Sequence, residues 1–284
     1  MKVVRTRGEC AQARAELGLG TTVGFVPTMG YLHEGHLSLV RRAKTECAAA
    51  VASIFVNPTQ FGPTEDLSTY PRDLDGDLAV LEQAGCDVAW LPEVADIYPP
   101  GFSTFVDVEG VTAVLEGARR PGHFRGVATV VAILLNVVRP TRAYFGQKDA
   151  QQTVVLRRMI EDLALGVDMV VAPTVREPDG LAMSSRNSYL DPAQRAAAVV
   201  LHRALQATRT AYAGGERDAD RLRTAMTEVI AGEPLAEPDY VSVADPDSLA
   251  ELATIDPARG ALLSLAVRFG RTRLIDNVVL PPSR

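Results

Sequence analysis

The sequence has little of the material that disulfide-stapled or membrane-spanning proteins need. Among its 284 residues there are only three cysteines, Cys10, Cys47 and Cys86, which are odd in number and far apart. We therefore expect neither a disulfide framework nor a cysteine zinc site. No uninterrupted run of about 18 apolar residues occurs, and the first residues lack a signal-peptide pattern. These absences predict a cytosolic protein without a membrane span.

A basic excess is absent as well. The formal net charge is -6, whereas a general nucleic-acid binder needs a basic surface to neutralise phosphates, so no nucleic-acid partner is expected. Apolar residues make up 47% and charged residues 23%, which is typical of an ordinary folded protein with a sizeable core. The length exceeds that of a usual single domain and favours a large domain followed by a smaller one.

What the sequence does have, up to about residue 174, is an alternation of short apolar, β-rich runs with longer helical patterns. This alternation predicts an α/β, Rossmann-like, doubly wound parallel sheet over residues 1–174. The expected strands lie at 22–26, 51–56, 88–91, 105–108, 143–145 and 169–171, and the expected helices at 37–48, 78–84, 127–138 and 151–163. Ligands of such sheets bind beyond the carboxyl ends of the strands, so polar residues that follow a strand are the first candidates for a site.

The pattern changes beyond the loop at 176–180. Helical stretches at 192–212 and 219–231 come first, and strand-like runs at 240–243, 262–269 and 272–276 follow them. Helices followed by strands predict a smaller C-terminal α+β domain over residues 175–284.

The segment His33-Glu34-Gly35-His36 follows an expected strand and opens an expected helix. Backbone N–H groups at a helix start favour anions, and Gly35 leaves room for a phosphate to approach. His33 and His36 are three residues apart, so both imidazoles can donate to phosphate oxygens, and the helix start should lower their pKa values and keep them neutral. Capping or packing by one histidine is an equal alternative, and the spacing differs from that of an HExxH zinc site.

Two other loops could contact phosphates. Lys148, in the segment 144–149, could place its ammonium against a phosphate, although a Lys beside an Asp is more often a solvated surface pair. In the segment 183–187, two hydroxyls and the guanidinium of Arg186 suit a phosphate chain, with a capped turn as the alternative. The basic, glycine-rich segment 116–126 is either a solvated loop or a lid near the phosphates.

Amide and acidic side chains also follow strands. Asn57 and Gln60 can recognise a small polar substrate, although Asn-Pro is also an ordinary turn signal. The acidic residues at 73–77 resemble a calcium loop with a misplaced glycine, and they can equally open the helix at 78–84.

Taken in order, the motifs PTMGYLHEGH, FVNPTQF, RPGHFRGVATVV, FGQKDAQQ and MSSRNSYL resemble those of the pantoate-β-alanine ligase family, also called pantothenate synthetases. HEGH is similar to the HIGH-type signature of nucleotidylyl transferases and class I aminoacyl-tRNA synthetases, and MSSR to their KMSKS loop. The resemblance runs from about Val23 to Leu190 and continues more loosely to the C-terminal strands. It implies that ATP and pantoate form pantoyl adenylate and pyrophosphate, and that β-alanine then displaces AMP to give pantothenate.

The resemblance also implies the roles of individual residues. It places His33, His36, Lys148 and Arg186 among the catalytic residues. It places ATP against Met29, Gly30, Tyr31, Leu32, His33, Glu34, Gly35, His36, Gly146, Gln147, Lys148, Asp149, Val175, Met183, Ser184, Ser185 and Arg186. Gln60, Gln152, Asn57 and Tyr70 match substrate positions for pantoate and β-alanine.

The resemblance implies ATP as a co-substrate with Mg²⁺, no tightly bound organic cofactor, and a homodimer. Asp77 matches an acidic position associated with magnesium, but Gly76 stands where the family pattern has an acid, which weakens the assignment. Two rival functions remain at this stage. One is a nucleotidylyl transferase that stops at an adenylylated product, and the other is a nucleotide-binding regulatory protein that has lost catalysis.

Overall fold

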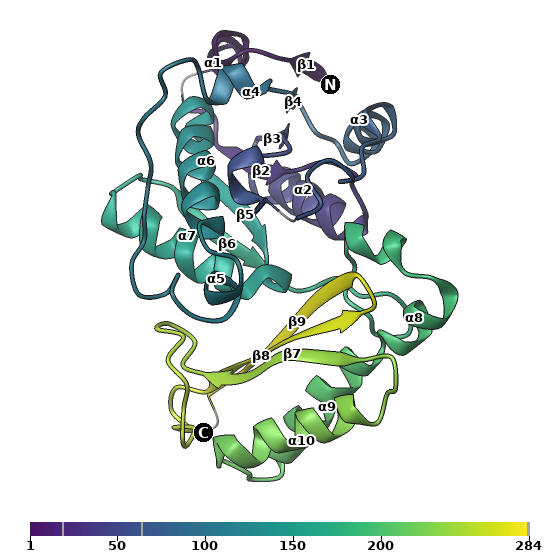
Figure 1. Ribbon diagram of the computed structural model, residues 1–284. Helices are drawn as coiled ribbons and strands as arrows, with labels where there is room; N and C mark the ends of the chain where they lie inside the picture. The colour runs from purple at the N-terminus through teal and green to yellow at the C-terminus, as the bar shows by residue number, and fades with distance from the viewer. Residues whose placement is uncertain (19, 64, 283–284) are drawn as a thin grey trace. The chain divides into compact units, whose positions relative to one another are not determined.

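The computed structural model describes residues 1–18, 20–63 and 65–282, and the chain divides into two compact units (Figure 1). The first unit comprises Met1–Gly146 and Val155–Pro173, and the second comprises Gln147–Val154 and Thr174–Arg284. The expected boundary after residue 174 therefore differs from this division at Thr174 and at the short segment Gln147–Val154.

The first unit is built on a parallel six-stranded sheet with the strand order β1-β4-β3-β2-β5-β6. Its strands are β1 (Lys2–Val4), β2 (Val23–Thr28), β3 (Ala49–Ile54), β4 (Val88–Trp90), β5 (Arg142–Gly146) and β6 (Asp168–Ala172). The chain moves outward from β2 through β3 to β4 and then returns to the other side of β2 with β5. This reversal is the position at which open α/β sheets bind their ligands.

Helices cover both faces of this sheet, because alternate strand residues point to opposite sides. The helices and short turns of the unit are α1 (Arg7–Glu16), α2 (Glu34–Glu46), the 3₁₀ turn η1 (Pro58–Gln60), α3 (Leu74–Gln83), α4 (Val94–Ile97), α5 (Leu115–Arg119), α6 (His123–Val138) and α7 (Ala150–Asp162), whose first turn belongs to the second unit. Phe25 and Trp90 face a core shared with α1, α6 and α7. Val26 and Tyr144 face the opposite core, which α2 and α3 close.

The packing of α2 on β2 leaves no room for a side chain at Gly24. A Cβ atom at this position would lie 2.8 Å from the Cβ of Ala43 in α2 and 3.0 Å from the ring of Tyr144. Gly24 pairs with Ala50 on one side and with Arg142 on the other. The helix therefore lies directly on the central strand.

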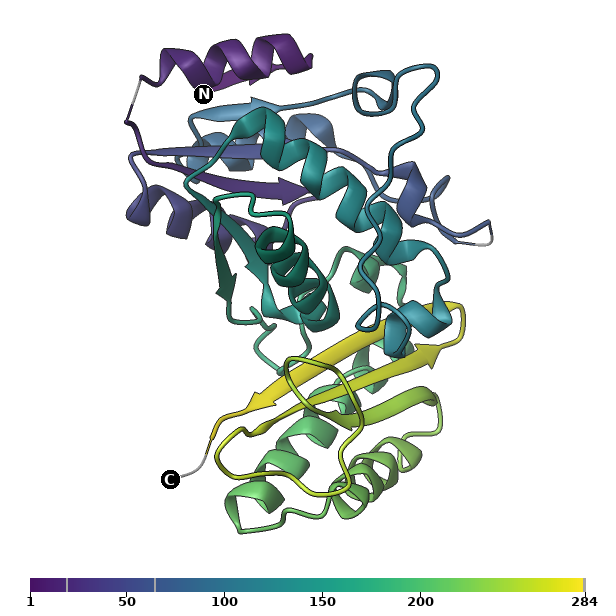
Figure 2. The same ribbon diagram turned by 90° about the vertical axis from the view of Figure 1, so that its left-hand side faces the viewer.

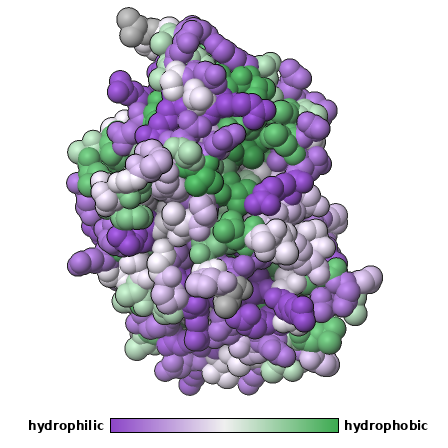
Figure 3. Space-filling model, turned by 45° about the horizontal axis from the view of Figure 1, so that its top comes forward, coloured by the Kyte–Doolittle hydropathy of each residue, from purple (hydrophilic) through white to green (hydrophobic). Residues whose placement is uncertain are grey.

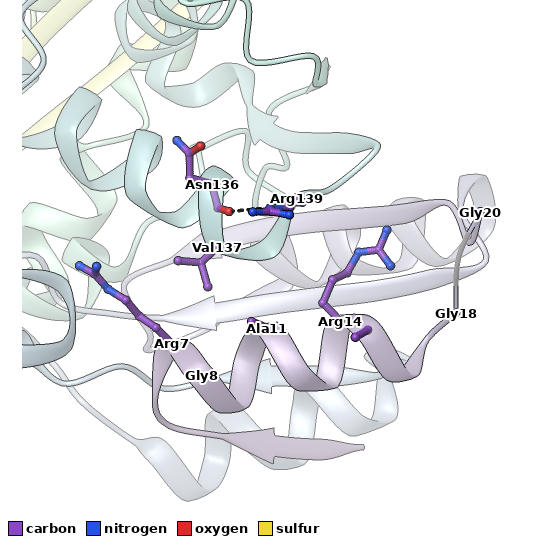
Figure 4. A pocket seen from close by; sticks show the side chains of 10 residues that line it. Arg7, Gly8, Ala11, Arg14, Gly18, Gly20, Asn136, Val137 and Arg139 are labelled. Carbon is purple, nitrogen blue, oxygen red and sulfur yellow. Dashed lines mark hydrogen bonds between the residues drawn. The ribbon is translucent and has the colours of Figure 1, made fainter.

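A pocket of about 680 Å³ lies between α1 and α6 (Figure 4). Arg7, Arg14 and Val137 are among the residues that line it. Its lining runs along α1 from Arg7, which follows the carboxyl end of β1, to Gly20, which leads into the amino end of β2. None of the lining residues is a candidate site residue.

The second unit combines a three-stranded antiparallel sheet with helices on one side of it (Figure 2). Its elements are η2 (Gln147–Asp149), η3 (Ser185–Tyr189), α8 (Pro192–Ala197), α9 (Val200–Ala213), α10 (Ala219–Ala231), β7 (Glu237–Ala244), β8 (Ala261–Phe269) and β9 (Thr272–Leu280). Asp191 caps α8, with Pro192 in its first turn, and Asp218 caps α10. Leu205 of α9, Leu222 of α10 and Leu265 of β8 are fully buried in the shared core.

The predicted fold class is confirmed, because a parallel six-stranded sheet is followed by a small α+β unit. One expected strand is wrong. Residues 105–108 form no strand: the N–H of Val106 donates to Thr129 Oγ1 of α6 at 2.9 Å, and the Phe105 ring lies under the guanidinium of Arg125. Apolar alternation here reflects an extended segment packed on a helix. The short β1 and helix α1 were not expected, and the helical stretch at 192–212 is divided into α8 and α9.

The three cysteines are buried and form no disulfide. Burial raises the pKa of the Cys86 thiol to about 11, so it stays protonated and inert at neutral pH. Within the described residues, no helix has both the length and the apolar character to cross a membrane. The space-filling view shows apolar and hydrophilic side chains interspersed on one face (Figure 3). Exposed large apolar side chains such as Val3, Val94 and Leu163 come from different elements, as is normal for a protein surface.

Gly24→Ala is expected to lower the free energy of unfolding by about 1–3 kcal/mol, because the added methyl overpacks the contact with Ala43. Urea unfolding measures this change. Ala43→Gly alone should cost about 1 kcal/mol from helix propensity. The double variant Gly24→Ala with Ala43→Gly should lose less free energy of unfolding than the sum of the two single losses. A loss equal to that sum would contradict the proposed contact.

Candidate active site

The turn between β2 and α2 carries the two histidines of the HEGH segment. His33 is the N-cap of α2, and its Nδ1 accepts the N–H of Gly35 at 3.1 Å. The Nδ1 of His36 accepts the N–H of His33 at 3.3 Å, so the two side chains cap the helix reciprocally. The ring centroids are 4.2 Å apart.

These bonds determine where each imidazole can carry its proton. A ring nitrogen that accepts a hydrogen bond has no hydrogen of its own, so the neutral form of either histidine carries its proton on Nε2. Each ring is thereby a hydrogen-bond donor through Nε2. The two interpretations that the sequence left open, capping and donation to phosphate, are compatible because they use different nitrogens of the same ring.

Gly35 leaves room for the side chain of His33. A Cβ atom there would lie 2.8 Å from Cε1 and 2.9 Å from Nδ1 of His33. The absence of a side chain therefore admits the His33 ring, which in turn caps the helix.

Asp77, in the first turn of α3, holds the loop that precedes α2. Its Oδ2 accepts the N–H of Tyr31 at 2.8 Å, and its Oδ1 accepts the N–H of Leu32 at 2.6 Å. Burial raises the pKa of the Asp77 carboxyl, while the two N–H groups act in the opposite direction. Asp77 is 4% exposed. Among the described residues, no group of three or more His, Cys, Asp or Glu side chains could hold a metal ion. Magnesium binding by Asp77 stays a prediction from the resemblance.

Asn57, Gln60 and Met29 lie together at the carboxyl ends of β2 and β3. Asn57 is 1% exposed, and its amide donates to Gln60 Oε1 at 3.0 Å and to the carbonyl of Gly126 in α6 at 3.2 Å. Gln60 Nε2 donates to the Met29 sulfur at 3.0 Å. Because a thioether is a weak acceptor, this amide donor retains capacity for a stronger acceptor such as a substrate hydroxyl or carboxylate.

The absence of a side chain at Gly126 allows α6 to lie close to the backbone at Thr59 and Gln60. A Cβ atom on it would lie 2.4 Å from the carbonyl oxygen of Thr59. Nearby, Tyr70 is buried and meets Phe61 edge-on, with ring centroids 5.8 Å apart.

The main-chain carbonyl of Gln60 is held by His123, which lies beside a largely buried ion pair between Arg120 and Glu65. Arg120 makes a two-pronged contact with Glu65, with Nε–Oε1 at 2.8 Å and Nη2–Oε2 at 2.6 Å. His123 Nδ1 lies 2.8 Å from the Gln60 carbonyl, and its Nε2 lies 3.1 Å from Nη1 of Arg120. A carbonyl only accepts and a guanidinium only donates, so His123 carries its proton on Nδ1 and is neutral. The segment 116–126 therefore packs beside Gln60 as α5 and the start of α6.

In the second unit, Asn277 of β9 clamps the turn η2. Its Nδ2 donates to the carbonyls of Gln147 at 3.0 Å and Lys148 at 2.8 Å, and its Oδ1 accepts from Gln147 Nε2 at 3.1 Å. Lys148 Nζ is 3.4 Å from Asp149 Oδ1, and the lysine side chain is 21% exposed. Lys148 thus forms the pair with Asp149 that the sequence allowed, but its backbone is anchored and its side chain is partly buried.

The loop that carries Val175 folds back on the loop that carries Met183. The N–H of Met183 donates to the carbonyl of Val175 at 3.0 Å. Arg176 pairs with Asp276 through two bonds of 2.6 and 2.9 Å, and the Asp276 side chain is 1% exposed. Two expected ATP contacts are therefore brought together beside a β9 carboxylate.

The MSSR segment forms the capped turn that the sequence allowed. Ser184 is the N-cap of η3, and its Oγ accepts the N–H of Arg186 at 3.3 Å. Ser185 is buried. Gln152 lies in the first turns of α7, and Gly146 ends β5.

Comparison with known proteins decides the family. The family model described as pantoate-β-alanine ligase matches residues 2–279. The chain belongs to the pantoate-β-alanine ligase family. The resemblance expected from the motifs is confirmed, and the chain is a ligase of that family.

Relatives of this family match over the full chain. The pantothenate synthetase of Herpetosiphon aurantiacus is 65% identical over 280 residues, which is 99% of this chain and 100% of the relative. The crystal structure of the Thermus thermophilus enzyme is 51% identical with a TM-score of 0.93, and the match covers 98% of this chain and 99% of that one. A Francisella tularensis ligase, described as complexed with "Beta-gamma ATP" and β-alanine, is 32% identical with a TM-score of 0.81 over 100% of both chains.

The motifs that identified the family did not reveal the residues that hold the candidate site in position. His123, Arg120, Glu65, Asn277 and Asp276 were not singled out as individual residues. Polar residues within the family motif RPGHF and at the end of β9 were the available signals. The sequence allowed capping by one histidine, and the reciprocal capping by His33 and His36 could have been recognised from their spacing, which is that of a capping box.

His123 should make stability depend on pH. Burial and the neighbouring Arg120 cation lower its pKa to about 4 from an ordinary value of 6.5, with Glu65 and Glu116 acting in the opposite direction. The unfolded chain binds a proton between these values and the folded chain does not. The contribution of neutral His123 to the free energy of unfolding is therefore complete above pH 6.5. It is lost as the pH falls towards 4, and the loss is up to about 3 kcal/mol.

His123→Asn removes this titration while keeping a donor for the Gln60 carbonyl. The difference in free energy of unfolding between wild type and variant should shrink as the pH is lowered from 7.5 to 4.5, as measured by urea unfolding. A difference independent of pH would show that His123 does not titrate with a lowered pKa.

Proposed function

We propose that this ligase condenses (R)-pantoate with β-alanine at the expense of ATP, through a pantoyl adenylate. The pantoate carboxylate attacks the α-phosphorus, forming a mixed anhydride between the acyl group and the phosphate while the bond to the leaving pyrophosphate breaks. The β-alanine amine then attacks the acyl carbon, and AMP leaves as an amide forms and a proton is released. The product is pantothenate.

The observation that carries the proposal is the pair of histidines at the start of α2. Their Nδ1 atoms are committed to main-chain N–H groups, so their Nε2–H groups are preorganised donors beside a helix N-terminus. Negative charge that grows on phosphate oxygens is stabilised by such donors, which need no reorganisation during the reaction. No protein nucleophile is required. The Francisella tularensis relative supports ATP and β-alanine as ligands of the same fold.

The remaining roles follow the family positions. Gln60 and Gln152 bind pantoate, with Gln60 also serving β-alanine, while Asn57 fixes the Gln60 amide through a bond of 3.0 Å. Tyr70 supports the neighbouring turn. Lys148, Ser184, Ser185 and Arg186 donate to ATP phosphates, and the backbone around Met29–His36, Gly146–Asp149, Val175 and Met183 contacts the nucleotide.

Magnesium would enter on the nucleotide phosphates, which is usual for this ion. No step is assigned to a protein-held ion, because the Asp77 oxygens face N–H groups. Homodimerisation and a cytosolic location stay predictions from the sequence.

An AMP-release assay with each substrate omitted in turn tests the reaction. We expect AMP only when ATP, pantoate and β-alanine are all present, and pyrophosphate from ATP and pantoate alone. Accumulation of an adenylylated product without AMP in the complete mixture would instead indicate a plain nucleotidylyl transferase. ATP binding without pantoate-dependent pyrophosphate exchange would indicate a regulatory protein.

His36→Ala and Lys148→Ala should each slow adenylate formation roughly 10²- to 10³-fold, the scale for loss of one preorganised donor to developing charge. Single-turnover pyrophosphate release with saturating ATP and pantoate measures the step. Lys2→Ala is the matched control, since Lys2 pairs with Glu16 at an exposed edge of the sheet. Rates near wild type in either folded variant would remove that residue from the proposed machinery.

A further inference from the structure

The turn that leads into the HEGH helix adopts an unfavourable backbone conformation. Gly30 has φ of +85° and Tyr31 has φ of +51°. A left-handed conformation is natural for glycine but costs free energy for a residue with a Cβ, and tyrosine is not among the residues that tolerate it well. Something in the fold must therefore hold Tyr31 in place.

Asp77 supplies that hold from another element. Its two carboxylate oxygens accept the consecutive N–H groups of Tyr31 and Leu32 at 2.8 and 2.6 Å. Successive N–H groups that converge in this way form an anion-binding concavity, called a nest, which in many nucleotide sites receives a phosphate. Here the nest is filled by an internal carboxylate.

The Asp77 carboxylate also packs closely against the turn. A Cβ atom on Gly30 would lie 2.9 Å from Asp77 Oδ2 and 3.0 Å from the Ile54 side chain. The N–H of Gly30 donates to Thr28 Oγ1 at 3.3 Å, and that hydroxyl donates to the Ser53 carbonyl at 2.7 Å. The turn is thus fixed at its beginning by β3 and at its end by α3.

We propose that Asp77 is a positioning residue for adenylation: its carboxylate holds the Gly30–Leu32 turn, in which Gly30 and Tyr31 are left-handed, and so sets the direction in which His33 and His36 enter α2. This inference rests on the proposed function for its kinetic consequence. Its structural part, the holding of two N–H groups, does not. It also replaces the family expectation of a magnesium ligand at Asp77 with a different role.

The structural part is tested without any substrate, by amide hydrogen exchange measured with NMR. In Asp77→Asn, the side-chain oxygen can still accept one of the two N–H groups, whereas the amide nitrogen is a donor and cannot accept the other. Exchange at one or both of the N–H groups of Tyr31 and Leu32 should accelerate at least tenfold. Asp75→Asn, an exposed position two residues earlier with the same change of charge, is the matched control and should leave both rates unchanged.

The kinetic part uses pyrophosphate release in a single turnover, with the magnesium concentration varied. A positioning role predicts that Asp77→Asn slows the step about 10- to 100-fold at saturating ATP while the half-saturating magnesium concentration stays the same. A magnesium ligand predicts the opposite: a raised half-saturating concentration with normal exchange at Tyr31 and Leu32. That second result would overturn the proposal, as would a variant unchanged in both exchange and rate.

A second substitution separates the turn from general damage to the fold. Tyr31→Asn introduces a residue that tolerates left-handed φ, so added to Asp77→Asn it should recover at least threefold of the lost rate. No recovery, with both variants folded by circular dichroism, would count against the strained turn as the cause. Should Asp77→Asn fail to fold, Asp77→Glu, which keeps the charge but lengthens the side chain, should show faster exchange at the same two amides, and unchanged exchange would overturn the proposal.

The outcomes distinguish this inference from the proposed function. If the wild-type chain releases no pyrophosphate from ATP and pantoate, the proposed function fails, whereas the exchange rates of Tyr31 and Leu32 still decide whether Asp77 holds the turn. If the wild type is active and exchange is unaffected in Asp77→Asn, only the inference about Asp77 fails.

Discussion

The close packing of α2 on the central strand β2 is the constraint from which the geometry of the first unit follows. Gly24 permits it, because any side chain at that position would meet Ala43 of the helix. With strand and helix fixed against each other, the chain has only Met29–His33 in which to leave β2 and enter α2. Within this connection Gly30 and Tyr31 have left-handed φ values. Asp77 of α3 accepts the N–H groups of Tyr31 and Leu32 and so holds the connection from a neighbouring element.

Features that depend on neighbouring residues could be predicted from the sequence. The alternation of strand and helix patterns predicted the sheet, because periods of 2 and 3.6 residues are local properties of the chain. The helix start at HEGH was found for the same reason, and family motifs then placed Gln60, Lys148 and Arg186 near strand ends or turns. The segment 105–108 shows the limit of this approach. Its apolar alternation is real, but its backbone bonds to Thr129 of α6 rather than to a strand.

The contacts that position the site could not be predicted, because the two partners are distant in sequence. Asp77 lies 46 residues from Tyr31, His123 lies 63 from Gln60, and Asn277 lies 130 from Gln147. Each of these side chains bonds to main-chain atoms of a motif. Main-chain groups are the same in nearly every residue, so the motif sequence does not indicate which side chain binds them. Only the fold brings the two together. A motif search therefore finds the residues proposed to bind substrate more readily than the residues that hold them in place.

The three histidines of the first unit show how the same side chain is set to different tasks by the backbone. At His33 and His36 a main-chain N–H points at Nδ1, which forces the proton of the neutral ring onto Nε2. At His123 a carbonyl faces Nδ1 and a guanidinium faces Nε2, which forces the opposite tautomer. A second proton on any of these rings would break a bond to the main chain or meet the Arg120 cation. The hydrogen bonds at Nδ1 are those of the neutral rings, so the proposed donation to phosphate by His33 and His36 needs no positive charge on them. Positive charge at such a site then comes from lysine and arginine, which are protonated at neutral pH.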